Sequence, residues 1–110
     1  MLVERIDIHH VAMPLLYPWR TASHEEWAIH SLLIRMEGGG QVGWGETAPF
    51  ADPAFSPEWA NGAFGVLRDW LGPALLGQEI GSGEELQRLL SPFKGNPFAK
   101  GGLDLAWWDL

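Results

Sequence analysis

The chain has 110 residues, of which 46% are hydrophobic and 19% are charged, and this composition predicts one folded domain and excludes an intrinsically disordered chain. The formal net charge of -7, from 14 acidic and 7 basic residues, repels phosphate backbones and anionic membranes, so nucleic acid is a poor candidate partner. The lack of cysteine excludes disulfide scaffolds and thiol enzymes, and since no run approaches the roughly 18 apolar residues of a membrane span, we expect a soluble cytoplasmic protein.

The first predicted element is a β-strand over residues 3–15. Apolar and polar residues alternate there, which is the period of a strand with one buried face. Pro14 and Pro18 are expected to end the strand, because proline lacks the N–H that a sheet ladder uses. Charged residues such as Glu4 and Asp7 also interrupt the apolar stretch that a signal peptide would need.

A hairpin is predicted next. Residues 27–37 and 41–48 form two more extended runs, each with apolar side chains on one side. Three glycines between them, at positions 38–40, predict a tight turn, and no helix follows them as a phosphate-binding loop would require. Three successive strands with short returns predict an antiparallel meander, since parallel strands need longer crossovers.

Helices are predicted in the second half of the chain. Ser56 as N-cap and Pro57 at the first helical position are expected to begin a helix that the Gly-Pro pair at 72–73 interrupts. Its apolar stripe consists of Ala60, Ala63, Phe64, Leu67 and Leu71. Ser82 and Glu85 have the spacing of a capping box, which predicts a second helix with a leucine-rich buried edge.

Residues 99–110 predict a helix that is apolar on almost every face. Leu105 and Trp108 lie off the stripe formed by Leu103, Ala106, Trp107 and Leu110. Gly101 and Gly102 would weaken such a helix, so close approach of a neighbouring backbone is expected there. An acid in this helix, Asp104, needs a partner, which is more often structural than catalytic.

These elements predict the α+β class: a three-stranded antiparallel meander followed by a helical bundle. A helix that is apolar all round usually lies between two packed layers, and this chain is long enough for only one of them. We therefore expect residues 1–98 to form one domain and residues 99–110 to begin the passage into a second domain that this chain does not contain.

Two segments are candidates for a binding site, because alternating strand directions bring residues 16–26 and 49–55 to the same end of the meander. They carry Tyr17, Trp19, Arg20, Thr21, Ser23, Phe50, Asp52 and Phe55. Aromatic walls, hydroxyl groups and one guanidinium describe a lid over a small acid, whose carboxylate Arg20 could bind bidentately. The alternative is a pair of ordinary solvated loops anchored by their aromatic side chains.

The remaining polar residues predict no catalytic group and no metal site within this chain. His9 and His10 are neighbours on a strand and so point to opposite faces, while His24 and His30 have no partner at ligand spacing. Packed or surface histidines are the better interpretation. Glu46 either orients the second loop through hydrogen bonds or faces solvent.

Several segments together resemble a known family. They are Met13-Pro14-Leu15, the loop at 17–23, Gly43-Trp44-Gly45-Glu46, Pro92-Phe93-Lys94-Gly95-Asn96 and residues 99–110. Over its whole length the chain resembles the N-terminal capping domain of the enolase superfamily. Within it, the chain is most similar to the muconate-lactonising subgroup, and there to o-succinylbenzoate synthases and N-acylamino acid racemases.

The resemblance implies a cap over a modified (β/α) barrel that lies beyond Leu110. In that family the barrel holds magnesium-binding carboxylates and acid/base lysines; a lysine removes the proton α to a carboxylate and the metal stabilises the enediolate. By position, Trp19, Arg20, Thr21 and Ser23 of the first loop and Phe50 through Phe55 of the second would contact a small carboxylate substrate. The isolated chain is then expected to be inactive and the full-length enzyme to be a homo-oligomer.

Other functions stay open on the sequence. Within the superfamily the alternatives are a dipeptide epimerase and a muconate cycloisomerase. A different class is a stand-alone interaction module that binds a partner through its tryptophan-rich C-terminal helix. The sequence that follows Leu110 separates the enzyme from the module.

Overall fold

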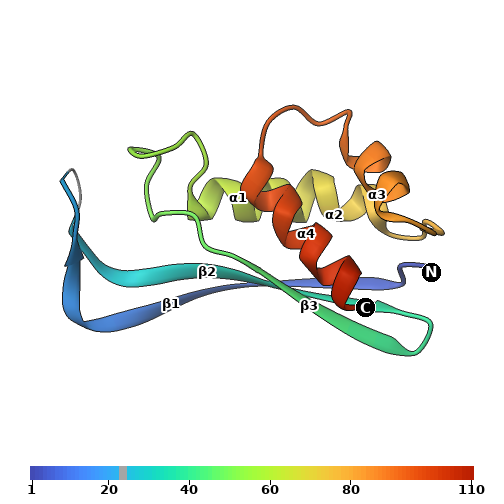
Figure 1. Ribbon diagram of the computed structural model, residues 1–110, viewed down its shortest axis with the longest axis horizontal. Coiled ribbons are helices and arrows are strands. Elements are labelled where there is room, and N and C mark those ends of the chain that lie inside the picture. The colour runs from blue at the N-terminus through green and yellow to red at the C-terminus, as the bar shows by residue number, and fades with distance from the viewer. Residues whose placement is uncertain (23–24) are drawn as a thin grey trace.

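The computed structural model describes every residue of the chain except 23–24. A three-stranded antiparallel sheet has the order β1-β2-β3, in which β1 is Arg5–Arg20, β2 is Glu25–Gly38 and β3 is Gln41–Thr47. The helical segments follow in chain order: α1 (Ala60–Val66), the π-helical turn η1 (Leu67–Leu71), α2 (Gly72–Leu75), α3 (Gly83–Leu90) and α4 (Pro97–Asp109). All of them cover one face of the sheet (Figure 1), so the predicted α+β class is confirmed.

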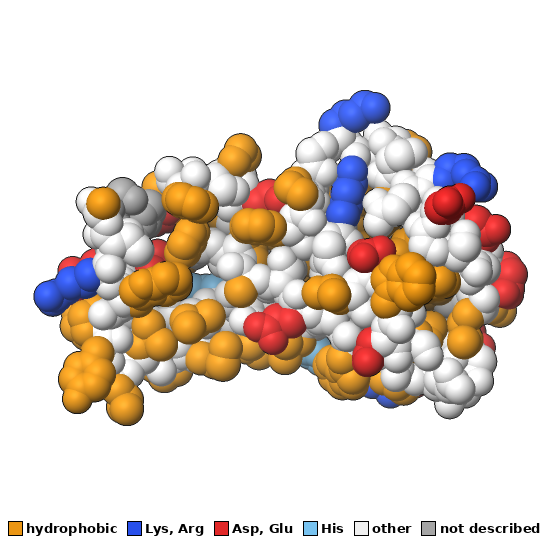
Figure 2. Space-filling view, in the orientation of Figure 1, with side chains coloured by type: hydrophobic (Ala, Val, Ile, Leu, Met, Phe, Trp, Pro, Cys, Tyr) orange, Lys and Arg blue, Asp and Glu red, His pale blue; other side chains and the backbone are white. Residues whose placement is uncertain are grey.

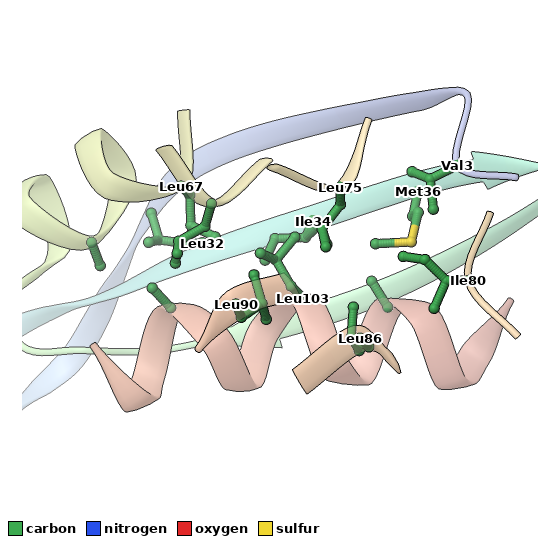
Figure 3. Packing of buried hydrophobic residues seen from close by; sticks show 14 residues of the cluster. Val3, Leu32, Ile34, Met36, Leu67, Leu75, Ile80, Leu86, Leu90 and Leu103 are labelled. Carbon is green, nitrogen blue, oxygen red and sulfur yellow. The ribbon is translucent and has the colours of Figure 1, made fainter. Parts of the chain in front are cut away.

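The core lies between this face of the sheet and the helices. Leu32, Ile34 and Met36 project from β2 toward the helices and are fully buried (Figure 3). The helices and the segment before α3 contribute Leu67, Leu71, Leu75, Ile80, Leu86, Leu90 and Leu103, all equally buried. None of the described helices is long and apolar enough to span a membrane.

Strand β1 is longer than the sequence predicted. It passes through Pro14 and Pro18 and ends at Arg20, and β2 begins at Glu25, so the loop expected over residues 16–26 is mostly a two-stranded arm. The pairing register shifts between Pro14 and Trp19. Because β1 is an edge strand, only every second N–H serves the ladder, and proline is tolerated there.

The first helix also begins later than predicted. Trp59 is its N-cap, whereas Ser56 accepts a hydrogen bond on its Oγ from the N–H of Glu58 at 3.1 Å. Ser56 therefore closes a local turn before the helix rather than capping it. Serine supports such turns as readily as it supports helix starts, which is why the sequence pattern misplaced the start by several residues.

The Gly-Pro pair does not interrupt the helix. The Gly72 N–H donates to the Leu67 carbonyl, five residues back, so a π turn joins α1 to α2. Pro73 falls in the first turn of α2, where its missing N–H is tolerated. At α3 the predicted N-cap is confirmed, because Ser82 Oγ accepts from the Glu85 N–H at 3.2 Å. The reciprocal bond of a capping box is shifted by one residue, since the Glu85 carboxylate accepts from the Gly81 N–H at 2.8 Å.

Helix α4 rests directly on the backbone of β3. A Cβ at Gly45 would collide with the Gly102 carbonyl oxygen, and one at Gly43 would lie 2.6 Å from the Leu110 nitrogen. Between these glycines, the Trp44 N–H donates to Asp109 Oδ2 at 2.8 Å. The backbone approach predicted at Gly101 and Gly102 is confirmed at Gly102, whose carbonyl oxygen faces Gly45. It is wrong at Gly101, where a Cβ would meet nothing within 4 Å.

The outer face of α4 remains exposed. Leu105 and Trp108 are 54% and 66% exposed, although both are large apolar side chains. Asp104 accepts a hydrogen bond from Gln87 Nε2 of α3 at 3.2 Å, which confirms a structural partner for this acid. The helix is thus buried where it meets the sheet and the neighbouring helices, and exposed on its outer face.

Replacing each of two glycines by alanine tests the packing of α4 against β3. Gly45→Ala should lower the free energy of unfolding by about 1–3 kcal/mol, because the new methyl group has no room against α4. Gly101→Ala should raise it by up to about 1 kcal/mol, because a Cβ there meets nothing within 4 Å and alanine favours a helix. Urea denaturation measures both, and equal effects of the two variants would contradict this packing.

Candidate functional site

The arm and the loop after β3 bring three predicted aromatic residues together. The rings of Trp19 and Phe50 have centroids 6.5 Å apart, and Phe55 packs edge-on against Phe50 at 5.3 Å. In Figure 2 hydrophobic side chains gather over the arm and the segment that faces it. The structure therefore joins the two candidate segments, as alternating strand directions predicted.

A pocket of about 250 Å³ opens between these segments. Its walls come from Trp19 and Glu26 on the arm, residues 28–30 of β2, residues 48–51 of the loop, and Phe98 at the start of α4. Apolar groups dominate this lining, and Glu26 and His30 are its titratable side chains. Such a site suits the apolar portion of a small molecule, with few polar groups to orient it.

Two polar residues predicted for the first loop, Arg20 and Thr21, do not line this pocket. Arg20 Nε donates to Glu25 Oε1 at 3.1 Å across the end of the arm, and its side chain is 72% exposed. Thr21 follows β1 and is exposed. Ser23 lies outside the described residues. Among those predicted site residues that the structure describes, the pocket lining contains Trp19, Phe50 and, from the predicted range Phe50 to Phe55, Ala51.

A histidine pair lies beside the pocket, and His30 is part of the pocket lining. His10 Nε2 and His30 Nδ1 are 3.0 Å apart, and the His10 ring lies 6.3 Å from the Phe64 ring. The expectation that His30 has no histidine partner is therefore wrong. The two residues meet diagonally, since His30 pairs with Ala12 in the sheet, and this contact depends on a strand register that spacing along the chain does not reveal.

The other polar candidates, His9 and Glu46, lie on the opposite face of the sheet from the helices. His9 stacks on Trp44 at 6.4 Å, so His9 and His10 do point to opposite faces. Glu46 is exposed and accepts from Ser31 Oγ at 3.1 Å. Of the two interpretations of Glu46, a solvent-facing acid is therefore the closer one.

The residue that ties the loop down is Glu58, which the sequence did not single out. It is 8% exposed, and its two carboxylate oxygens accept from the N–H groups of Phe98 at 2.7 Å and Ala99 at 3.0 Å. Glu58 thus contacts the first turn of α4 although it precedes Phe98 by 40 residues in the sequence. In the sequence, Glu58 resembles any acidic residue in the first turn of a helix, so nothing marked it as a contact to α4.

The described residues do not form a metal site. No group of three or more histidine, aspartate or glutamate side chains within the described part of the chain could hold an ion. A magnesium ion needs several oxygen ligands in near-octahedral geometry. The resemblance places the magnesium ligands on the barrel beyond Leu110, not on these residues.

The comparisons with known proteins agree with this architecture. Residues 4–110 match the family model "Mandelate racemase / muconate lactonizing enzyme, N-terminal domain". An N-succinylamino acid racemase of Amycolatopsis sp is 38% identical over 99% of the chain and 30% of its own length. For an o-succinylbenzoate synthase of Bacillus subtilis the identity is 29%, over 98% of the chain and 29% of the relative.

Solved structures show the same fold. An enolase-superfamily protein from Listeria innocua has a TM-score of 0.90 at 30% identity, over 98% of this chain and 29% of that one. The L-Ala-D/L-Glu epimerase of Bacillus subtilis has a TM-score of 0.86 at 27% identity, over 98% of this chain and 30% of that one. The chain spans about 30% of the length of the curated relatives it matches. It belongs to the mandelate racemase/muconate lactonizing enzyme family of the enolase superfamily and has the fold of that family's N-terminal domain.

Proposed function

We propose that this chain is the substrate-capping domain of an enzyme that removes the proton α to a carboxylate, of the N-succinylamino acid racemase or o-succinylbenzoate synthase type. The observation that carries the proposal is the pocket between Trp19 and Phe50, built from two segments at one end of the sheet. The relatives named above support the reaction type.

The chemistry itself is proposed to lie in a second domain. In this proposal residues 1–98 are the cap, and residues 99–110 lead into a C-terminal (β/α) barrel that supplies the magnesium ligands and the acid/base lysines. The exposed side chains of Leu105 and Trp108 support a further packed layer on α4. The full-length enzyme is proposed to act as a cytoplasmic homo-oligomer, and the isolated chain to be inactive.

The cap's contribution is to exclude water and to select the substrate. Trp19, Phe50 and Phe55 present apolar surface on the side of the site that a barrel would leave open. Arg20, at the end of the arm, is proposed to attract the substrate carboxylate. Thr21 and Ser23 are proposed to add hydroxyl contacts near it.

The reaction type is tested with the full-length enzyme and magnesium. N-Succinylamino acids, the o-succinylbenzoate precursor, an Ala-Glu dipeptide and muconate are assayed in parallel. Turnover of either of the first two supports the proposal. Preference for the dipeptide or for muconate would instead assign the epimerase or cycloisomerase activity that the names of two other relatives carry.

Replacement of Trp19 tests the pocket. Trp19→Ala in the full-length enzyme should lower kcat/KM by about 10-fold or more, because an aromatic wall of the site is lost. Trp70→Ala is the matched control, since Trp70 is similarly exposed (61% against 54%) but lies on η1, away from the pocket. Steady-state kinetics decide, and an equal loss in both variants would remove Trp19 from the site.

Replacement of Arg20 tests the carboxylate contact. Arg20→Ala should raise KM for the acid substrate by about 10-fold and change kcat much less, as expected when an interaction common to ground and transition states is lost. Arg88→Ala, on the exposed side of α3, is the control. An unchanged KM would show that Arg20 only pairs with Glu25 in the arm.

A further inference from the structure

Glu58 is a buried carboxylate held by backbone groups. Its two oxygens accept from consecutive N–H groups of the first turn of α4, and its side chain is almost fully enclosed. Hydrogen bonds to an ionised acceptor are stronger than neutral ones, and the first turn of a helix favours negative charge. These contacts fix the segment before α1 against α4.

Helix α4 depends on this distant residue for its N-terminus. The preceding residue, Asn96, has a left-handed backbone conformation (φ 58°, ψ 46°) and makes no side-chain cap. Its Nδ2 instead donates to the Lys94 carbonyl at 2.9 Å. Without Glu58, the partly buried N–H group of Phe98 and the buried N–H group of Ala99 would lose their acceptor, and a buried N–H without an acceptor is costly.

The same carboxylate joins two walls of the pocket. Phe98, which it holds through the backbone, is one wall. Phe50, another wall, is tied to the base of the same loop, since its carbonyl accepts from the Ala60 N–H at 2.9 Å. Only Trp59 separates Ala60 from Glu58, so a short path connects Phe50 to Phe98.

We infer that Glu58 is a positioning residue for the substrate pocket, and that it sets the separation of the Phe50 and Phe98 walls. This inference rests on the proposed function, because it gives the pocket a role in choosing substrates by size. If Glu58 served only as a helix cap in folding, it would stabilise the domain and leave the choice of substrate unchanged. The two roles differ in a measurable quantity.

That quantity is a ratio of specificities in the full-length enzyme. N-Succinylalanine and N-succinylphenylalanine differ only in side-chain size, and the ratio of their kcat/KM values does not depend on the fraction of enzyme that is folded. Glu58→Ala should change this ratio by about 10-fold or more, since misplacement by about 1 Å is sufficient for that. Glu58→Gln, which keeps the shape and one acceptor oxygen, should change it less.

Ser82→Ala is the matched control, because it removes the cap of α3, which contributes no wall to the pocket. It should lower Tm by about 2–4 °C and leave the ratio unchanged. If Glu58→Ala lowers Tm in the same way and leaves the ratio unchanged, the positioning role is overturned. If that variant does not fold, the ratio of Glu58→Gln decides the question.

Failure of the proposed function gives a different result. If the wild-type enzyme turns over neither the N-succinylamino acids nor the o-succinylbenzoate precursor, the proposed function fails. In that case, and also if only the precursor is turned over, amide hydrogen exchange tests Glu58 by itself. Glu58→Gln should speed exchange both in residues 49–56 and in residues 97–101, whereas Ser82→Ala should affect neither. Faster exchange confined to residues 97–101 would reduce Glu58 to a helix cap.

Discussion

The close contact between α4 and β3 fixes the place of this helix on the sheet, and the rest of the structure depends on it. Gly43 and Gly45 of β3 lack side chains, so the backbone of α4 lies directly against them. Between the two glycines, the Trp44 N–H donates a hydrogen bond to Asp109. A helix held this close to a strand cannot shift along it without collision. Its first turn therefore brings Phe98 to the pocket, while Leu105 and Trp108 stay exposed on its outer face.

The pocket has walls of two kinds. Phe98 belongs to the helix that the core holds, whereas Trp19 belongs to an arm held by its pairing with β2, next to a register shift. Changes on the arm can thus alter the shape of the site at little cost to folding. Changes at Phe98 or Glu58 act on the core as well, because the first turn of α4 is part of both.

Local patterns in the sequence correctly predicted the features that depend on neighbouring residues, such as strands and a helix start. Alternation predicted the meander, and Ser82 with Glu85 predicted the start of α3 correctly. The prolines of β1 and the Gly-Pro pair at 72–73 were misinterpreted, because an edge strand and a π turn tolerate proline where an ideal element does not. The His10–His30 contact and the role of Glu58 depend on register and on contacts 40 residues apart, which periodicity cannot reveal.

This division also explains why the family was easier to predict than the reaction. The Gly-Trp-Gly-Glu segment and residues 99–110 meet each other in the structure, and their work is packing: glycine against helix backbone, and Asp109 on a strand N–H. Segments with such a role specify a fold rather than a substrate. Substrate choice would lie with side chains such as Trp19 and Phe50, which can change without disturbing the packing of α4 against β3. Relatives named for racemisation, synthesis, epimerisation and cycloisomerisation can accordingly share this architecture.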